Sequence, residues 1–493
     1  MPSSVIEQIR KAAQANPAAT AMIFDGKLIT YAQLLSLLAA TARLLHAQGV
    51  KAGDAVGLTL PNTPVHLIAL LALARLGACS IPLHDRFSSV TRTRLVEKFS
   101  IRVIVGGSAE AGVKGIPLIV LNTLSASGSE ADALPFDAAL EPATPFRVLL
   151  TSGTTGEPKG VLLTHGQVLA RLEQAVEGWS PRTRLLVPDI HLSIGFFWPL
   201  MALCRGGSLV FTRSTELGEQ VLAVQLHAVT HIVFSPWSAQ QLVDALPAES
   251  AGLPSLEHLR LVGGAASAKL LHSLSQRVTP HIYSPYALTE LATLTVLSPE
   301  DLLADPSSAG RLRPGARAEI VGPDDQPLPP GTRGQIRLAT TSMPRNYYRD
   351  DEHTRQKFRQ GWFYTGDTGY LSADGMLHVE GRVDDILNIG GHKVTPQYIE
   401  DTLMQHPEVK EAVALLLESA SSEPQLVAAV IPRQPRVSAD LRAYCQGKLG
   451  PMTPEKFFFM KEFPRNPSGK VLRADLARLV HEHALAAVKT QRA

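Results

Sequence analysis

Cysteine is scarce in this chain, which contains only three among its 493 residues. Cys79, Cys204 and Cys445 lie far apart, and their spacing is not that of a metal site. An odd number of cysteines without a regular framework also argues against a disulfide-stapled secreted fold. We therefore expect the protein to work in a reducing compartment, the cytoplasm.

The sequence also lacks a large charge of one sign and a long apolar run. The formal net charge is only +2, and no basic stripe interleaved with aromatic residues is present, so nucleic acid is not an expected partner. The longest apolar run, residues 66–79, is short for a membrane span and carries Arg75, which favours a buried helix leading into a strand. No charged segment followed by an apolar one stands near the N-terminus, so we expect neither a signal peptide nor a membrane span.

The order of helical and strand patterns predicts an α/β fold with more than one domain. A chain of 493 residues is too long for one ordinary core. Helical and strand patterns alternate through the first part, as in layered α/β folds with largely parallel sheets. Short strands and tight turns from about residue 308 indicate a small β-rich subdomain. We predict a large N-terminal domain over residues 1–383 and a small, mobile α+β C-terminal domain over residues 384–493.

A loop rich in glycine and threonine, residues 150–161, is the most informative local feature. It combines four hydroxyl side chains, three glycines and Lys159 between two apolar runs that are expected to be strands. Glycine lets backbone N–H groups turn toward an anion, and hydroxyls and a lysine add donors, so the loop suits a triphosphate. It is not a Walker A loop, because Pro158 precedes the lysine and Gly160 follows it. A flexible polar turn is the alternative interpretation.

Four later segments contain residues that suit ligand binding, although three of them also have a plainer explanation. Residues 286–290 pair an aromatic ring with a carboxylate, and residues 362–370 place an aspartate in a glycine-flanked turn. Residues 381–394 fall at the expected domain boundary, and residues 465–473 place a lysine on a Ser-Gly loop before the last helix. The plainer explanations are a core tyrosine near a surface glutamate, a capped turn and a solvated lysine.

Together and in this order, the five segments resemble the adenylate-forming superfamily, which includes acyl- and aryl-CoA ligases, the adenylation domains of peptide synthetases, and luciferase. The resemblance runs from the helix start at Thr30 to Lys470, and it is most specific in the phosphate loop and in residues 361–400. It implies that a carboxylic acid reacts with ATP to give an acyl-AMP and pyrophosphate, and that a thiol then displaces AMP. The chemical difficulty is the repulsion between the carboxylate and the α-phosphate, which positive charge and N–H donors must offset.

The resemblance also implies a role in ATP binding for each matching position. Tyr286 would stack on the adenine, and Asp367 with Arg382 would bind the ribose. Thr289 would contact the α-phosphate, and Glu290 would hold Mg²⁺. The β- and γ-phosphates would be held by the loop residues Thr151, Ser152, Gly153, Thr154, Thr155, Gly156 and Lys159.

Other matching positions would act on the acid and the thiol. Lys470 would bridge the carboxylate and the α-phosphate in the first half-reaction. Asp384 would be the hinge about which the C-terminal domain turns, and Gly390 and Gly391 would then line a thiol channel. His191 is expected beside the carboxylate, a packed loop histidine being the alternative.

The acid itself is predicted from the expected pocket walls. Ala287 stands where family members selective for acetate carry tryptophan, which argues against strict acetate selectivity. Trp237 falls where many members carry a smaller residue, and its ring would shorten the pocket. Further walls are expected from Phe196, Gly263 and Gly264. We therefore predict an aryl or short-to-medium acyl acid.

The predicted acceptor is the thiol of coenzyme A. Residues 385–393 resemble those of CoA ligases more than those of peptide-synthetase modules, and no carrier domain follows Lys470. The alternatives are a carrier-protein phosphopantetheine, an amine that would form an amide, and a non-catalytic nucleotide-binding relative. The presence of Lys470, Glu290 and Asp367 argues against the last. ATP, Mg²⁺ and coenzyme A are thus the expected cofactors, and a monomer or homodimer is the expected assembly.

Overall fold

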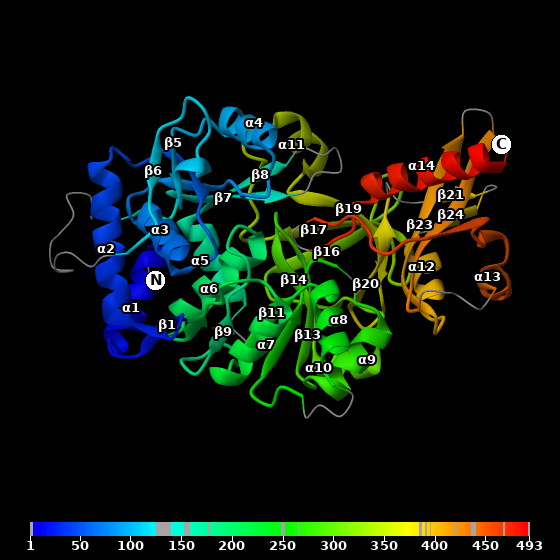
Figure 1. The fold of residues 1–493 in the computed structure, drawn as a ribbon, viewed down its shortest axis with the longest axis horizontal. Helices are drawn as coiled ribbons and strands as arrows, with labels where there is room; N and C mark the ends of the chain where they lie inside the picture. The colour runs from blue at the N-terminus through cyan, green and yellow to red at the C-terminus, as the bar shows by residue number, and fades with distance from the viewer. Residues whose placement is uncertain are drawn as a thin grey trace.

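The computed structural model describes residues 3–124, 140–151, 158–175, 178–247, 252–264, 266–383, 387–389, 392–394, 396–419, 422–434, 440–466 and 469–491. Figure 1 shows a broad N-terminal region, coloured blue to yellow, with a smaller C-terminal unit in orange and red at its side. The predicted α/β fold with a large N-terminal and a small C-terminal part is therefore confirmed. The boundary between residues 383 and 384 stays a prediction, because residues 384–386 lie outside the described residues.

A six-stranded sheet carries the glycine-rich loop. Neighbouring strands pair in parallel except β7 and β8, which are antiparallel. Thr151 pairs with Lys159 across β7 and β8, so the predicted strand–loop–strand arrangement is confirmed. In spatial order the strands are β6 (Leu118–Val120), β5 (Val103–Gly106), β3 (Ala55–Thr59), β4 (Cys79–Pro82), β7 (Pro145–Thr151) and β8 (Lys159–Thr164).

Local sequence explains two helices of the N-terminal region. α2 (Tyr31–Ala47) begins at Thr30, which forms a capping box with Gln33 as its N-cap residue. α3 (Pro64–Arg75) is buried along its whole length and leads into β4, as the apolar run predicts. The other elements of this part are α1 (Val5–Ala15), the 3₁₀ turn η1 (Ala109–Ala111), α4 (Ser89–Phe99) and α5 (His165–Gln174).

A second sheet changes from parallel to antiparallel pairing at β13 (Ile282–Leu288). Its parallel side runs through β12 (His258–Leu261), β11 (His231–Phe234), β9 (Arg184–Leu186), β10 (Ser208–Val210) and β1 (Thr20–Phe24), with β2 (Lys27–Thr30) as an antiparallel edge. Four helices connect these strands and cover the sheet: α6 (Ser193–Cys204), α7 (Leu217–Leu226), α8 (Pro236–Ala245) and α9 (Ala268–Arg277).

The antiparallel side of the same sheet corresponds to the predicted β-rich subdomain. It does not stand apart, because β14 continues hydrogen bonding directly from β13. The strands follow in the order β14 (Ala292–Leu297), β15 (Gly310–Leu312), β20 (Met376–Arg382), β19 (Trp362–Leu371), β17 (Gly334–Thr340) and β16 (Ala316–Val321), with β18 (Phe358–Arg359) paired to β19. The helices here are α10 (Pro299–Ala304) and α11 (Asp351–Lys357).

The C-terminal unit packs helices on both faces of its own small sheet. Apolar residues of α12 (Pro396–Met404) and α13 (Leu441–Leu449) cover one face, and residues of α14 (Arg473–Gln491) cover the other. The strands are β23 (Val409–Ser419), β24 (Ser422–Pro432) and β25 (Lys456–Phe459), with the hairpin β21 (Leu387–Ile389) and β22 (His392–Val394) and the 3₁₀ turn η2 (Gly450–Met452) also in this part. β23 and β24 pair antiparallel, and Leu415 lies opposite Val427.

Candidate active site

Lys159 and Glu290, far apart in sequence, meet at one tyrosine. The Tyr347 hydroxyl donates a hydrogen bond to Glu290 Oε1 over 2.6 Å, and Lys159 Nζ lies 5.6 Å from the centre of the Tyr347 ring. The Tyr348 N–H donates to the Gly160 carbonyl over 2.7 Å, which ties the tyrosine segment to the end of the glycine-rich loop. Sequence reasoning missed Tyr347, and a tyrosine in a polar stretch carries no motif that would have singled it out.

The charge of Lys159 is set by its surroundings. The side chain is buried, and burial lowers its pKa, whereas Asp350 and Glu290 act in the opposite direction. The positive charges of Lys98 and Arg382 also lower the pKa. Thr151 is half-buried beside Lys159. The other predicted phosphate-binding residues, Ser152, Gly153, Thr154, Thr155 and Gly156, lie outside the described residues.

A buried arginine forms hydrogen bonds with the backbone at Glu290. Arg171 donates to the Thr289 carbonyl over 3.0 Å and to the Glu290 carbonyl over 2.9 Å. In the described part of the chain, no hydrogen bond or ion pair is recorded for Glu290 Oε2. Mg²⁺ commonly takes one or two carboxylates together with substrate phosphates, so Glu290 fits that ion. The described residues contain no group of three or more His, Cys, Asp or Glu that could hold a metal alone.

Tyr286, Asp367 and Arg382 form a second polar cluster, from β13, β19 and β20. The Tyr286 hydroxyl donates to Asp367 Oδ2, and Arg382 Nη1 lies 3.3 Å from Asp367 Oδ1. Burial raises the pKa of Tyr286 well above its ordinary value, and the Asp367 charge adds to this effect. Gly366 has φ +82°, and a Cβ there would lie 3.0 Å from Arg382 Nη2. Residues 362–370 form part of β19 rather than the expected turn, and glycine at position 366 allows both the positive φ and the close approach of the arginine.

Thr289 has a hydroxyl neighbour that sequence reasoning missed. Ser193, the first residue of α6, places its Oγ 3.3 Å from Thr289 Oγ1. The segment was expected to offer His191 to the acid instead. The irregular glycine spacing after His191 was the available signal that the matching position was displaced along the chain.

His191 itself lies behind the cavity wall rather than on it. Its Nε2 is 2.8 Å from the Leu60 carbonyl oxygen, and its ring packs 4.5 Å from His66 and 4.6 Å from His84. Burial lowers the pKa of His191 to about 4. This environment corresponds to the packed-histidine alternative and does not support direct contact with an acid. Asp189 faces the cavity from the same segment, with Oδ2 3.0 Å from His84 Nε2.

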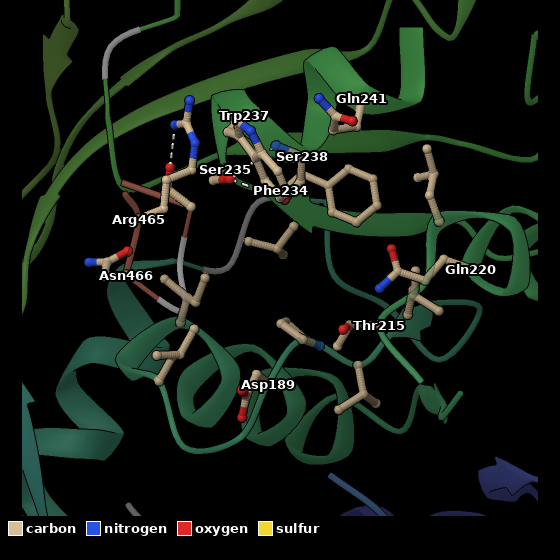
Figure 2. Close-up of a pocket in the computed structure, with 18 of the residues that line it drawn as sticks. Asp189, Thr215, Gln220, Phe234, Ser235, Trp237, Ser238, Gln241, Arg465 and Asn466 are labelled. Carbon is tan, nitrogen blue, oxygen red and sulfur yellow. Dashed lines mark hydrogen bonds between the residues drawn. The ribbon is translucent and has the colours of Figure 1, made fainter. Parts of the chain in front are cut away.

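A cavity of about 470 Å³ lies between the N-terminal region and three residues of the C-terminal unit, Arg465, Asn466 and Gly469. Figure 2 shows Arg465 and Asn466 on one side, Thr215 and Gln220 on the opposite side, and Trp237 above. The wall mixes apolar side chains with amide, hydroxyl and charged groups. The residues that line it from the N-terminal region are Arg86, Leu186, Val187, Pro188, Asp189, Leu192, Ile194, Thr215, Leu217, Gln220, Val233, Phe234, Ser235, Trp237, Ser238 and Gln241.

Of the predicted acid-pocket residues, Trp237 lines this cavity and the others occupy different places. Phe196 is fully buried in the main core, where the Arg147 guanidinium lies 5.1 Å from the ring centre, so its prediction as a pocket wall does not match this cavity. Gly263 and Gly264 are exposed at the end of β12, near Pro236. Ala287 is exposed at an irregularity between β13 and β14.

The lysine-bearing loop of the C-terminal unit borders the cavity. Lys470 is exposed, its N–H donates to Asn466 Oδ1 over 2.9 Å, and the preceding Gly469 lines the wall. The predicted hinge Asp384 and the predicted thiol-channel residues Gly390 and Gly391 lie outside the described residues. The structure thus brings a cationic loop of the second unit next to an N-terminal cavity. Among the described residues, no helix is long and apolar enough to cross a membrane.

Two family models match the chain. The model of AMP-binding enzymes covers residues 9–348, and that of the AMP-binding enzyme C-terminal domain covers residues 398–470. The chain belongs to the family of AMP-binding enzymes. The predicted membership of the adenylate-forming superfamily is confirmed, and the two matched stretches fall in the large and the small part of the fold.

Curated relatives of this AMP-binding enzyme include two CoA ligases of aromatic acids. A 4-chlorobenzoate–CoA ligase of Arthrobacter sp is 28% identical over 507 residues, which is 98% of this chain and 96% of the relative. An indoleacetate–CoA ligase of Aromatoleum aromaticum is 28% identical over 499 residues, which is 96% of this chain and 98% of the relative.

Solved structures share the fold of this AMP-binding enzyme over almost its whole length. The o-succinylbenzoate coenzyme A synthetase of Bacillus subtilis, in complex with ATP and magnesium ion, matches with a TM-score of 0.85 at 25% identity over 97% of this chain and 99% of that chain. ATP-bound MatB of Rhodopseudomonas palustris matches with a TM-score of 0.87 at 23% identity over 98% and 99%. The amide bond synthetase McbA of Marinactinospora thermotolerans matches with a TM-score of 0.84 at 23% identity over 97% and 99%.

Proposed function

We propose that this AMP-binding enzyme uses ATP to activate a carboxylic acid as an acyl-AMP and then transfers the acyl group to coenzyme A. The observation that carries the proposal is the meeting of Lys159 and Glu290 at Tyr347, next to the Asp367–Arg382 pair. A cation, a carboxylate and an aspartate–arginine pair together suit a nucleotide with magnesium. The CoA-ligase names of the curated relatives support the same activity.

In the first half-reaction, a carboxylate oxygen of the acid attacks the α-phosphorus of ATP, and pyrophosphate leaves with the electrons of the broken P–O bond. Lys159 would hold the phosphates that leave, and Asp367 with Arg382 would orient the ribose. Magnesium, held by Glu290, would neutralise charge on the phosphates. Lys470 would offset the repulsion between the carboxylate and the α-phosphate, which is an electrostatic contribution of the kind that dominates phosphoryl and acyl transfer.

In the second half-reaction, the thiolate sulfur attacks the acyl carbon, and AMP leaves with the electrons of the carbon–oxygen bond. The proton of the thiol goes to solvent or to AMP. The same position of Lys470 that favours the first step would stand in the path of the thiol. We therefore propose that the C-terminal unit turns about Asp384 between the two steps, so that Gly390 and Gly391 line the thiol's approach.

We further propose an aromatic acid of modest size as the substrate. The cavity of about 470 Å³ offers the rings of Phe234 and Trp237 together with polar groups, which suits a flat ring with a polar substituent. The relatives named after 4-chlorobenzoate and indoleacetate support an aryl class.

A panel of benzoates, cinnamates, arylacetates and C2–C12 fatty acids, assayed for ATP-dependent pyrophosphate release with the full chain and Mg²⁺, tests the first step. We expect release with aryl acids and formation of acyl-AMP in equal amount. Activity only with acetate or only with long-chain acids would contradict the proposed acid class, and no release with any acid would overturn the function. The mass of the product formed with coenzyme A, with an amine or with a phosphopantetheinyl carrier then identifies the acceptor.

A further inference from the structure

Helix α8 presents one side to the C-terminal unit. Trp237, Gln241 and Asp244 are four and seven residues apart in α8, so they lie along one face of the helix. Asp244 Oδ2 lies 3.6 Å from Lys410 Nζ on β23, and Trp237 meets Arg465 and Gly469. The salt bridge is partly exposed on both sides and contributes little to docking. Trp237 is therefore the main contact of this face.

Trp237 packs against the backbone that carries the predicted catalytic lysine. The Arg465 guanidinium carbon lies 5.5 Å from the centre of the Trp237 ring, within range of a cation–π interaction. A Cβ added at Gly469 would lie 3.0 Å from Trp237 Cε3 and 3.3 Å from Ser235 Oγ. The main chain at Gly469 thus touches the ring, and Lys470 is the next residue.

Hydrogen bonds connect the residues that contact Trp237 to one another and to Lys470. A shift of the contact with Trp237 would therefore also shift Lys470. Arg465 Nη1 donates to the Gly469 carbonyl over 2.7 Å, and Arg465 also pairs with Glu411 on β23. The Asn466 N–H donates to the Lys470 carbonyl over 2.9 Å. An isolated bridge joins Arg465 to Val471 and closes the loop. Because of these contacts, the backbone at Lys470 should follow the backbone at Gly469, which rests on Trp237.

We propose that Trp237 is a positioning residue for the first half-reaction: its ring is the seat, the surface that holds Arg465 and Gly469 in place and so positions Lys470, the residue after Gly469. This inference rests on the proposed function, since it assigns Lys470 to adenylate formation. It also differs from a role for Trp237 as a wall that limits the acid. A wall changes the affinity for the acid, whereas a seat changes the rate of adenylation when acid and ATP are saturating.

The test uses the full-length Trp237→Ala and Trp237→Phe variants in both half-reactions. For Trp237→Ala we expect kcat for acid-dependent pyrophosphate release to fall roughly tenfold, with an unchanged KM for ATP, because the cation–π contact with Arg465 and the packing against Gly469 are both lost. Thioester formation from supplied acyl-AMP should keep the wild-type rate. Trp237→Phe retains an aromatic face and should stay within about threefold of wild type. Leu226→Ala, which removes a 71% exposed apolar side chain on α7, is the matched control and should match wild type.

Three results would overturn the seat. A change confined to the KM for the acid would mean that Trp237 is only a pocket wall. An equal loss of rate in both half-reactions would indicate a folding defect. An unchanged rate of pyrophosphate release would show that the contact does not contribute to adenylation. A second measurement needs no acid: Trp237 emission, taken as the difference between wild type and Trp237→Phe, should become more accessible to acrylamide in Arg465→Ala. Unchanged quenching would refute docking. If no acid supports pyrophosphate release in the wild type, the proposed function fails while the quenching result still decides the seat.

Discussion

Removing the hydroxyl of Tyr347 should weaken the hold of this enzyme on magnesium. Tyr347 is 3% exposed, and its hydroxyl donates a hydrogen bond to Glu290 Oε1 over 2.6 Å. A hydrogen bond to a buried charged group contributes about 1.5–3 kcal/mol, and loss of a residue that orients a metal ligand typically lowers metal affinity about 10–100-fold. Tyr347→Phe also keeps the ring beneath Lys159, so the cation–π contact is retained.

The assay is the Mg²⁺ dependence of pyrophosphate release at saturating ATP and acid. For Tyr347→Phe we expect the half-saturating Mg²⁺ concentration to rise at least tenfold, with partial recovery of the rate at high Mg²⁺. Tyr348→Phe is the matched control, because the Tyr348 ring stacks on Phe99 at 5.8 Å and belongs to the same segment. It should behave as wild type. An unchanged Mg²⁺ requirement in Tyr347→Phe would refute the view that this hydroxyl orients Glu290 as a magnesium ligand.

Three further predictions concern the lysines, the ribose site and acid stability. Lys470→Ala should nearly abolish pyrophosphate release while sparing thioester formation from supplied acyl-AMP, and Lys159→Ala should cost less in the first step; equal loss in both steps for Lys470→Ala would contradict the two-position mechanism. Asp367→Asn removes the charge beside Arg382 and should raise the KM for ATP about tenfold or more, checked by ATP titration at saturating acid. Burial lowers the pKa of His165 to about 4, below its unfolded value of 6.5, so the unfolded chain binds more protons between these values. Stability should therefore fall, by about 3 kcal/mol for this group, as pH drops from 6.5 to 4; in urea unfolding, His165→Gln should show a shallower pH dependence than wild type, and an unchanged dependence would contradict the assignment.

Much of the fold could be predicted because the signals are local. The capping box at Thr30 marks the start of α2, and the continuous apolar run marks the buried α3 and the strand that follows. Apolar runs on both sides of the glycine-rich loop predict the β7–β8 pair. The join between the parallel and antiparallel halves at β13 was not predictable in this way, because strand order depends on pairing between distant segments.

The candidate site was predicted in its residue types but not in all its contacts. Glu290, Asp367 and Arg382 were found from short motifs and lie in polar clusters, as expected for nucleotide binding. His191 and Phe196 belong to the segment that was expected to line the acid pocket. Both rings nevertheless pack away from the cavity. The direction in which a side chain points from a loop or a helix start depends on how other layers of the fold pack against it. The local sequence does not contain that information.

By itself, the sequence determined the class of this protein: a glycine- and hydroxyl-rich loop with Lys159, an ordered set of short motifs and a distant Lys470, in a chain of alternating helices and strands. These features depend only on residue type and on spacing along the chain, and both can be taken directly from the sequence. Only the tertiary structure decided that Tyr347 joins Lys159 to Glu290, that Ser193 rather than His191 meets Thr289, and that Trp237 supports the lysine loop. Each of these contacts joins segments that are distant in sequence and come together only when separate layers or separate units pack. Such contacts depend on the folded structure and not on local sequence.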